Sequence, residues 1–233
     1  MGVICTITEC LWKVIKSENS SGSKSEGMEE ERVALDKAKM SRGIETLDKF
    51  VTEDEMIYAF SPITMVSLGG YLAVSHFQNP STTEDIDVII DPELQLAMVK
   101  VGRDLGFGEK WMNDSVALFV SKSACESIFE DAEKQNIILW SGENIRILAA
   151  PLEWGLETKL RRLSTKPHHL KAITDVEDVL VILNTLIDQN EGPLERDTIR
   201  KLNRNGFDVA IAHSVLDRVA KTYQERYGNN PFF

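Results

Sequence analysis

Cysteine and long apolar segments are both scarce in this chain of 233 residues. Its three cysteines, Cys5, Cys10 and Cys125, lack the spacing of metal ligands, and their odd number does not indicate a disulfide framework. No apolar run reaches the length of about 18 residues that a membrane-spanning helix requires, so no such helix is expected. We therefore predict a protein of a reducing intracellular compartment, either the cytoplasm or the nucleus.

The chain also has fewer positively charged residues than negatively charged ones. The chain carries 26 lysine and arginine residues against 37 aspartate and glutamate residues, which gives a formal net charge of -11 and a pI of about 4.9. This balance argues against a protein that binds nucleic acid through a generally basic surface, but it leaves room for a local basic patch around one nucleotide or one RNA end. Hydrophobic residues make up 42% of the chain, which is typical of a soluble domain with a sizeable core.

The first 27 residues differ in composition from the rest of the chain. They lack the basic start and the cleavage site of a secretory signal, but Gly2 and Thr6 fit the pattern for N-myristoylation, with Cys5 available for a second acyl group. That pattern is short, and a small amphipathic or poorly ordered leader explains the same residues without lipidation. Serine, glycine and charged residues dominate 17–27, which is typical of a flexible linker. We therefore assign residues 1–27 to a leader and linker.

Periodicity beyond the linker predicts helices, then a core of strands and helices, then a helical end. The apolar stripe over 28–50 predicts a helix that is interrupted at Ser41-Arg42-Gly43. We predict an α/β (α+β) fold, with a mixed β-sheet flanked by helices over 28–190 and a helical C-terminal extension over 191–233. The expected strands are Ile63–Leu68, Ile86–Ile90, Val116–Val120, Ile137–Trp140 and Ile145–Ala149, and the main expected helices are Tyr71–Phe77, Leu152–Leu163, Asp175–Asp188, Leu194–Leu202 and Val209–Tyr227.

The stretch from Met65 to Pro92 holds the most informative pattern. Gly69-Gly70 follows a short apolar run and precedes a predicted helix, where a glycine pair lets backbone N–H groups approach a phosphate closely. Asp85 and Asp87 are two residues apart in an apolar strand, so their carboxylates point to the same face. Carboxylates and substrate phosphates are the ligands that Mg²⁺ prefers. In the alternative interpretation, both aspartates lie at a strand edge and face water.

These residues carry a resemblance to a known family. The run LGGYLAVSHFQNPSTTEDIDVII resembles the hGG…[ST]xDhDh motif of the nucleotidyltransferase superfamily, which has the polymerase-β-like fold. The nearest likeness is to the bacterial abortive-infection and toxin–antitoxin nucleotidyltransferases and their uncharacterised relatives. The resemblance implies that Gly69 and Gly70 contact a nucleoside triphosphate, and that Asp85 and Asp87 hold Mg²⁺. It also implies that Thr83 lies near the phosphates.

A second match lies downstream. The segments ETKLRRL and TDVEDVLVIL resemble a pair of helices in the same family. The resemblance implies that Lys159 contacts phosphate or the attacking group and that Asp175 lies near the catalytic centre. Arg162 and Asp178 would then support them. From the residues alone, Lys159 is equally well explained as a solvated helix residue, Asp175 as a helix N-cap, and the arginines as partners of glutamates on their own helix.

A histidine pair and the lack of a third carboxylate in the later predicted strands each allow two interpretations. His168-His169 lies in a basic loop, where it either contacts phosphate or an acceptor, or is simply solvated. Many members of the superfamily carry a third catalytic carboxylate on a later strand, but the predicted strands after Asp87 contain none. The acidic residues nearest to those strands are Asp114, Glu143 and Glu153.

Two functions follow as hypotheses. The first is Mg²⁺-dependent transfer of a nucleoside monophosphate from a nucleoside triphosphate to a hydroxyl group of RNA, of a protein or of a small molecule. The alternative is a catalytically inactive protein of the same fold, with a regulatory or scaffold role in binding protein or RNA. The missing third carboxylate and the low basic charge motivate the alternative.

Overall fold

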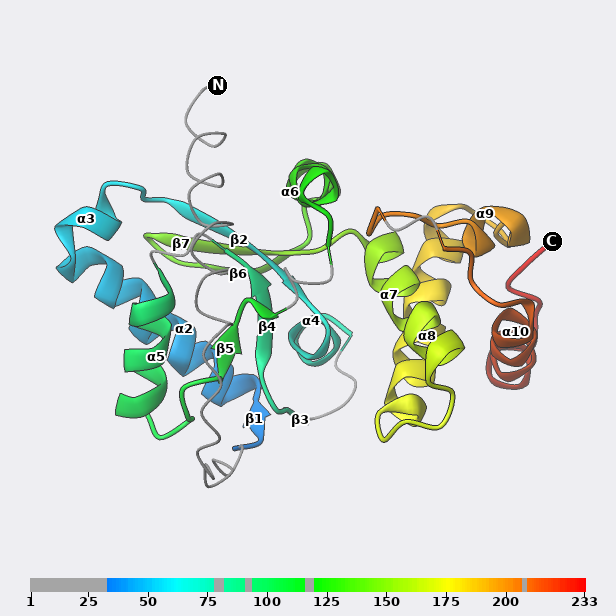
Figure 1. Ribbon diagram of the computed structural model, residues 1–233, viewed down its shortest axis with the longest axis horizontal. Helices are drawn as coiled ribbons and strands as arrows, with labels where there is room; N and C mark the ends of the chain where they lie inside the picture. The colour runs from blue at the N-terminus through cyan, green and yellow to red at the C-terminus, as the bar shows by residue number, and fades with distance from the viewer. Residues whose placement is uncertain (1–32, 78–81, 91–93, 116–119, 207–208) are drawn as a thin grey trace, which may run out of the picture. The chain divides into compact units, whose positions relative to one another are not determined.

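A mixed five-stranded β-sheet lies at the centre of the residues that the computed structural model describes, namely 33–77, 82–90, 94–115, 120–206 and 209–233 (Figure 1). The strands of this sheet are β2 (Ile63–Leu68), β4 (Ile86–Ile89), β5 (Met112–Asn113), β6 (Ile138–Ser141) and β7 (Ile145–Ala149). Their order is β5-β4-β2-β7-β6. β2 is parallel to β7 and antiparallel to β4, while β4 is parallel to β5 and β6 is antiparallel to β7. A separate antiparallel pair joins β1 (Leu35–Asp36) to β3 (Thr82–Thr83).

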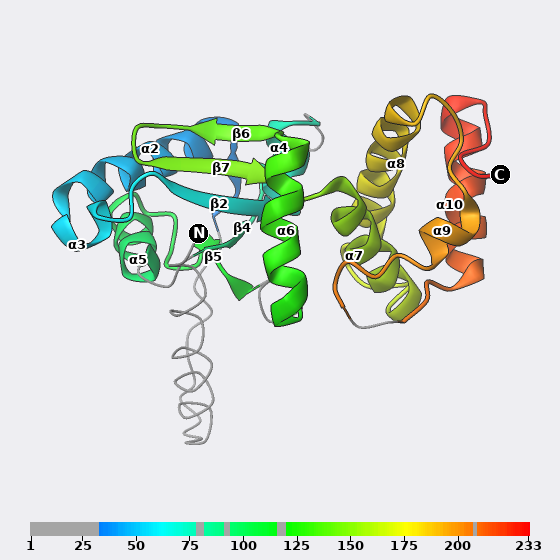
Figure 2. The same ribbon diagram turned by 90° about the horizontal axis from the view of Figure 1, so that it is seen from above.

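Helices cover both faces of the sheet, and further helices come after its last strand in the sequence. They are α2 (Lys37–Glu53), α3 (Glu55–Tyr58), α4 (Gly70–Ser75), α5 (Gln95–Asp104), α6 (Lys122–Gln135), α7 (Leu152–Thr165), α8 (Ala172–Gln189), α9 (Arg196–Arg200) and α10 (His213–Tyr227). Alternate strand residues point to opposite faces. Met65 and Ile147 therefore pack in the cluster with α2 and α5, and Val66 and Leu148 in the cluster with α6. Figures 1 and 2 show these helices on their two sides of the sheet.

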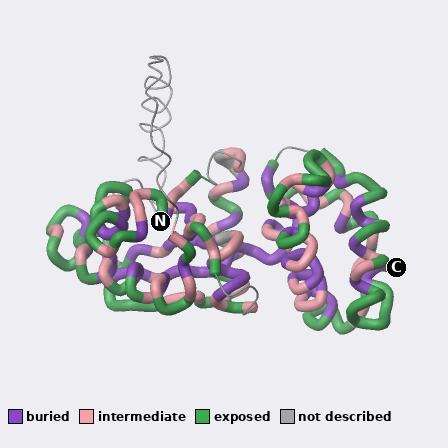
Figure 3. Tube along the Cα trace, turned by 90° about the horizontal axis from the view of Figure 1, so that it is seen from below, coloured by how far each residue is buried: buried purple, intermediate pink, exposed green. Residues whose placement is uncertain are grey.

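The α/β (α+β) class with C-terminal helices is confirmed. α7, α8 and α10 share an apolar core that includes Leu160, Leu183 and Leu216, and all three side chains are fully buried. Figure 3 shows buried positions along the inward sides of these helices. Among the helices that the structure describes, none is long and apolar enough to cross a membrane.

The described residues all belong to one compact unit. The expectations for the leader and linker over 1–27, including lipidation at Gly2, lie outside the described residues.

One prediction about local structure is wrong and another is largely untested. α2 does not break at Ser41-Arg42-Gly43 but runs through this segment without interruption. Gly43 serves close packing there, because an added Cβ would lie 2.4 Å from the ring of Trp111. The predicted strand Val116–Val120 falls mostly outside the described residues, and β5 pairs with β4 instead.

Asp48 of α2 fixes the turn of the β6–β7 hairpin. Its carboxylate accepts hydrogen bonds from the backbone N–H groups of Glu143 (3.2 Å), Asn144 (2.9 Å) and Ile145 (2.7 Å). A buried carboxylate is tolerated where several N–H groups satisfy it. The turn therefore depends on a residue about 95 positions earlier in the chain.

Candidate functional site

The site begins at the glycine pair between β2 and α4. Gly69 has φ +62° and ψ -128°, a conformation that residues with a side chain rarely adopt. A Cβ added at Gly69 would lie 3.4 Å from Oδ2 of Asp87, and one at Gly70 would lie 2.0 Å from Oγ1 of Thr83. Glycine is therefore required at Gly69 by the backbone conformation and at Gly70 by close approach to Thr83.

Asp85 and Asp87 lie beside this turn. Asp87 pairs in register with Leu68 at the end of β2 and with Asn113 of β5. The Asn113 amide is 3.4 Å from Oδ2 of Asp85, and the Thr83 hydroxyl donates a hydrogen bond to the backbone carbonyl of Asp85. No described residue donates a hydrogen bond to the carboxylate of Asp87. Of the two aspartates, Asp87 is therefore the one whose carboxylate accepts no hydrogen bond from the residues that the structure describes.

The surroundings of Asp87 disfavour its ionised form. Burial, followed by the negative charge of Asp85, raises the pKa of Asp87 from an ordinary value of 3.8 to about 6. The positive charges of Lys171, Arg162 and Lys159 act in the opposite direction without cancelling the rise. A bound cation would satisfy both carboxylates and remove this penalty.

Lys159 and Arg162 supply the positive side of the site from one face of α7. Lys159 is 8% exposed, and its Nζ lies 2.5 Å from Oδ2 of Asp178 and 3.5 Å from Oδ1 of Asp175. Arg162 donates two hydrogen bonds to Asp175, one from Nε at 2.6 Å and one from its terminal nitrogen. The interpretation of Lys159 as a solvated helix residue is therefore wrong.

Asp175 is not an N-cap either, because it lies inside the first turn of α8 and accepts hydrogen bonds from cationic side chains. Burial acts to raise its pKa, but the hydrogen bonds and charge of Arg162, together with the charge of Lys159, outweigh burial and lower the pKa of Asp175. Burial raises the pKa of Asp178 in spite of Lys159. Asp175 is therefore an ionised group that orients its neighbours.

The alternative of an arginine bonded to a glutamate of its own helix applies to Arg161, whose Nε lies 2.7 Å from Glu157.

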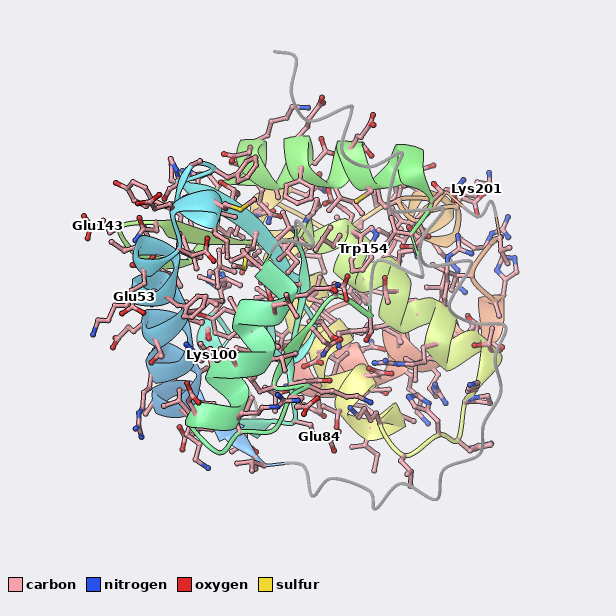
Figure 4. All side chains as sticks on the ribbon, turned by 60° about the vertical axis from the view of Figure 1, so that its left-hand side comes forward. Glu53, Glu84, Lys100, Glu143, Trp154 and Lys201 are labelled. Atoms are coloured by element: carbon pink, nitrogen blue, oxygen red, sulfur yellow. The ribbon has the colours of Figure 1, made fainter. Side chains whose placement is uncertain are left out.

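The loop between α7 and α8 adds residues whose place the sequence did not predict. The ring of His169 bridges the backbone carbonyl of Lys166 (2.6 Å) and Oδ2 of Asp175 (2.9 Å). Lys171 forms an ion pair with Glu84 across 3.4 Å. Figure 4 labels Glu84 on the segment that leads into β4. In the sequence, these loop residues are marked by the run KPHHLK between two predicted helices, which indicates a basic loop but not which residues it contacts.

The predicted residues therefore come together from segments far apart in the chain. A cavity of about 10 Å³, with room for about one water molecule, is lined by Gly69, Lys159 and Asp178 among others. Gly69 in turn borders Asp87, and Gly70 borders Thr83. The structure thus places Gly69, Gly70, Thr83, Asp85, Asp87, Lys159, Arg162 and Asp175 in one region.

A third carboxylate is not found beside Asp85 and Asp87 in the part of the chain that the structure describes. β7 contains none, and Asp114 instead accepts a hydrogen bond from Gln95 at 2.7 Å. Glu143 lies in the turn that precedes β7, whereas the site borders the opposite end of that strand. No group of three or more metal-ligating side chains occurs among the described residues.

Two carboxylates do not form a metal cage made of protein groups alone. Mg²⁺, however, is ordinarily bound through one or two carboxylates, with waters and substrate phosphates completing the shell. Asp85 and Asp87 are within two residues of each other, and the carboxylate of Asp87 accepts no hydrogen bond from the described residues. This donor set fits a magnesium ion that arrives together with a polyphosphate.

Comparison with known proteins does not extend these observations. No family model, no curated protein and no solved structure matches the chain significantly.

Proposed function

We propose that this chain is a Mg²⁺-dependent nucleotidyltransferase that moves a nucleoside monophosphate from a nucleoside triphosphate to a hydroxyl group. The observation that supports the proposal best is the convergence of two carboxylates, a glycine turn and two buried or half-buried cations. Asp87 lies beside Gly69, and the charges of Lys159 and Arg162 act on Asp87. These groups come from three separate elements. A site for an anionic ligand with its counter-cation requires both signs of charge in one place.

Each group has a part in binding the triphosphate. Because Gly69 and Gly70 carry no side chains, the backbone of this turn lies close to Thr83 and Asp87. Arg162 uses two of its five donors on Asp175, so other donors remain for phosphate oxygens. Lys159 contributes a buried positive charge next to the same turn. Asp85 and Asp87 would hold Mg²⁺, which neutralises charge on the leaving pyrophosphate when it is bound.

In the proposed reaction, the acceptor oxygen forms a bond to the α-phosphorus while the bond from that phosphorus to the bridging oxygen breaks. Pyrophosphate leaves, and the proton of the acceptor hydroxyl passes to solvent. Asp175 is poorly suited to take this proton, since both of its oxygens accept hydrogen bonds from cationic side chains and its pKa is lowered. We therefore assign Asp175 to positioning Arg162.

A labelling experiment tests the proposal. The purified chain is incubated with Mg²⁺ and each α-³²P-labelled nucleoside triphosphate, with total RNA, with protein or with small hydroxyl compounds as acceptors. We expect label transfer that Asp85→Asn and Asp87→Asn abolish, while Asp104→Asn, a matched change at an exposed position of α5, retains it. The proposal is refuted by absence of label transfer together with absence of any rise in melting temperature with magnesium and nucleotide.

One observation favours the inactive alternative. Among the described residues, no third carboxylate joins Asp85 and Asp87 in a group that could hold a metal ion. A protein of this kind would still bind a magnesium nucleotide and use it as a regulatory ligand. Binding of each magnesium nucleotide without label transfer to any acceptor would favour this alternative over the enzyme.

A further inference from the structure

Both ring nitrogens of His169 face hydrogen-bond acceptors. Nδ1 lies 2.6 Å from the backbone carbonyl oxygen of Lys166, and Nε2 lies 2.9 Å from Oδ2 of Asp175. A carbonyl oxygen and a carboxylate oxygen both accept hydrogen bonds and donate none. A neutral imidazole has one N–H and can satisfy only one of these acceptors. Both hydrogen bonds therefore form together only when the ring is doubly protonated and positive.

The charged groups around His169 are consistent with this state. Asp175, on α8, is 1% exposed and also binds Arg162 and Lys159 of α7. Burial acts against its ionised form, but the hydrogen bonds and charges of these cations more than compensate and lower the pKa of Asp175. Asp178 binds Lys159 and does not bind His169. Asp175 therefore stays ionised and can accept from a cationic ring.

The two hydrogen bonds of His169 fasten the loop that carries Lys171. One hydrogen bond joins the ring to the backbone carbonyl of Lys166 within the same loop. The other joins the ring to the carboxylate of Asp175 on α8. Two residues later, Lys171 reaches Glu84 at 3.4 Å, and its charge acts on Asp87. The cation at the edge of the candidate site is thus carried by a loop to whose conformation the side chain of His169 contributes two hydrogen bonds.

We propose that His169 is a positioning residue whose protonated ring clamps the loop 166–171 to α8 and thereby holds Lys171 beside Asp85 and Asp87. Loss of the ring proton removes one of the two hydrogen bonds and one positive charge, so the loop loosens. The consequence for ligand binding rests on the proposed function: a polyphosphate binds more weakly once the clamp opens.

The clamp is tested first without any ligand. The full chain contains four histidines, so ¹⁵N-histidine labelling gives a simple spectrum in which His169→Gln assigns the signal of interest. We expect both ring nitrogens of His169 to be protonated at low pH. As the ring loses its proton, amide hydrogen exchange over 166–171 should accelerate by about tenfold, the effect of losing a hydrogen bond to a charged group.

Three variants separate the clamp from a general loop effect. His169→Gln should show fast exchange at every pH, and His169→Arg, which keeps the charge and two donors, should show slow exchange at every pH. His168→Gln, a matched change at the exposed neighbour, should behave as the wild type does. A neutral His169 ring at every pH between 5.5 and 8, or exchange that is the same in His169→Gln and the wild type, would overturn the clamp.

Binding of inorganic tripolyphosphate with Mg²⁺ then tests the consequence. We expect the wild type to bind it several-fold more weakly as His169 loses its proton, while His169→Arg removes that pH-dependent step. Equal steps in the wild type and His169→Arg would overturn the link between clamp and ligand. If the spectra and exchange rates confirm the clamp while the wild type binds no polyphosphate at any pH, the proposed function fails and the clamp stands.

Discussion

Asp87 makes the stability of the protein depend on pH, because its ionised form is unfavourable in the folded chain without a cation. Its pKa is raised from 3.8 to about 6 by burial and by Asp85. Two pKa units correspond to about 3 kcal/mol, and partial solvent access reduces the expected effect to roughly 1–2 kcal/mol. Since the folded state keeps the proton of Asp87 to a higher pH than the unfolded state does, stability falls as pH rises from about 4 to about 6 and then levels off.

Asp87→Asn removes this titration and the repulsion from Asp85. We expect the variant to match the wild type near pH 4 and to be more stable by roughly 1–2 kcal/mol at pH 7.5, both without divalent cations. Urea unfolding at several pH values measures the difference, and Asp104→Asn, the same change at an exposed position of α5, serves as the control. The prediction is wrong if Asp87→Asn and the wild type have the same pH profile. It is also wrong if the stability of Asp87→Asn relative to the wild type is lower at pH 7.5 than at pH 4.

Further substitutions test other parts of the structure. Gly70→Ala places a methyl group 2.0 Å from the Thr83 hydroxyl; we expect a loss of roughly 1–3 kcal/mol in urea unfolding, and a smaller loss when Thr83→Ala is present too. Asp48→Ala leaves three N–H groups of the hairpin turn without their acceptor; calorimetry should show a loss of roughly 2–4 kcal/mol. Lys159→Met leaves Asp178 buried without its cation; we expect a loss of roughly 3–5 kcal/mol in urea unfolding, against no measurable change for Lys49→Met on the exposed side of α2.

Much of the fold near the site could be predicted from local sequence patterns. Alternation and apolar runs predicted β4 and β7, and the leucine stripe predicted α7, because strands and amphipathic helices leave a periodic signal. The interruption at Gly43 was wrong because glycine has two meanings that local sequence does not separate. It can end a helix, or it can admit a neighbour such as Trp111, which lies 68 positions later.

The candidate site was predictable only in part. The glycine pair and the aspartates lie within one short stretch, so their proximity follows from a strand, a turn and a helix. Lys159 and Asp175 were placed by resemblance, whereas their mutual contact depends on how α7 packs against α8. The ring of His169 and the Lys171–Glu84 pair are set by the loop conformation, for which the sequence carries no periodic signal.

We propose that Asp85 and Asp87 bind a magnesium nucleotide beside Gly69-Gly70. Titration calorimetry of the full chain with each nucleoside triphosphate, with and without Mg²⁺ at pH 7.5, tests it most directly. We predict Mg²⁺-dependent binding of at least one nucleotide, weakened by more than about tenfold in Asp87→Asn and unchanged in Asp104→Asn. Absence of binding in the wild type, or binding that Asp87→Asn leaves intact, would contradict the account.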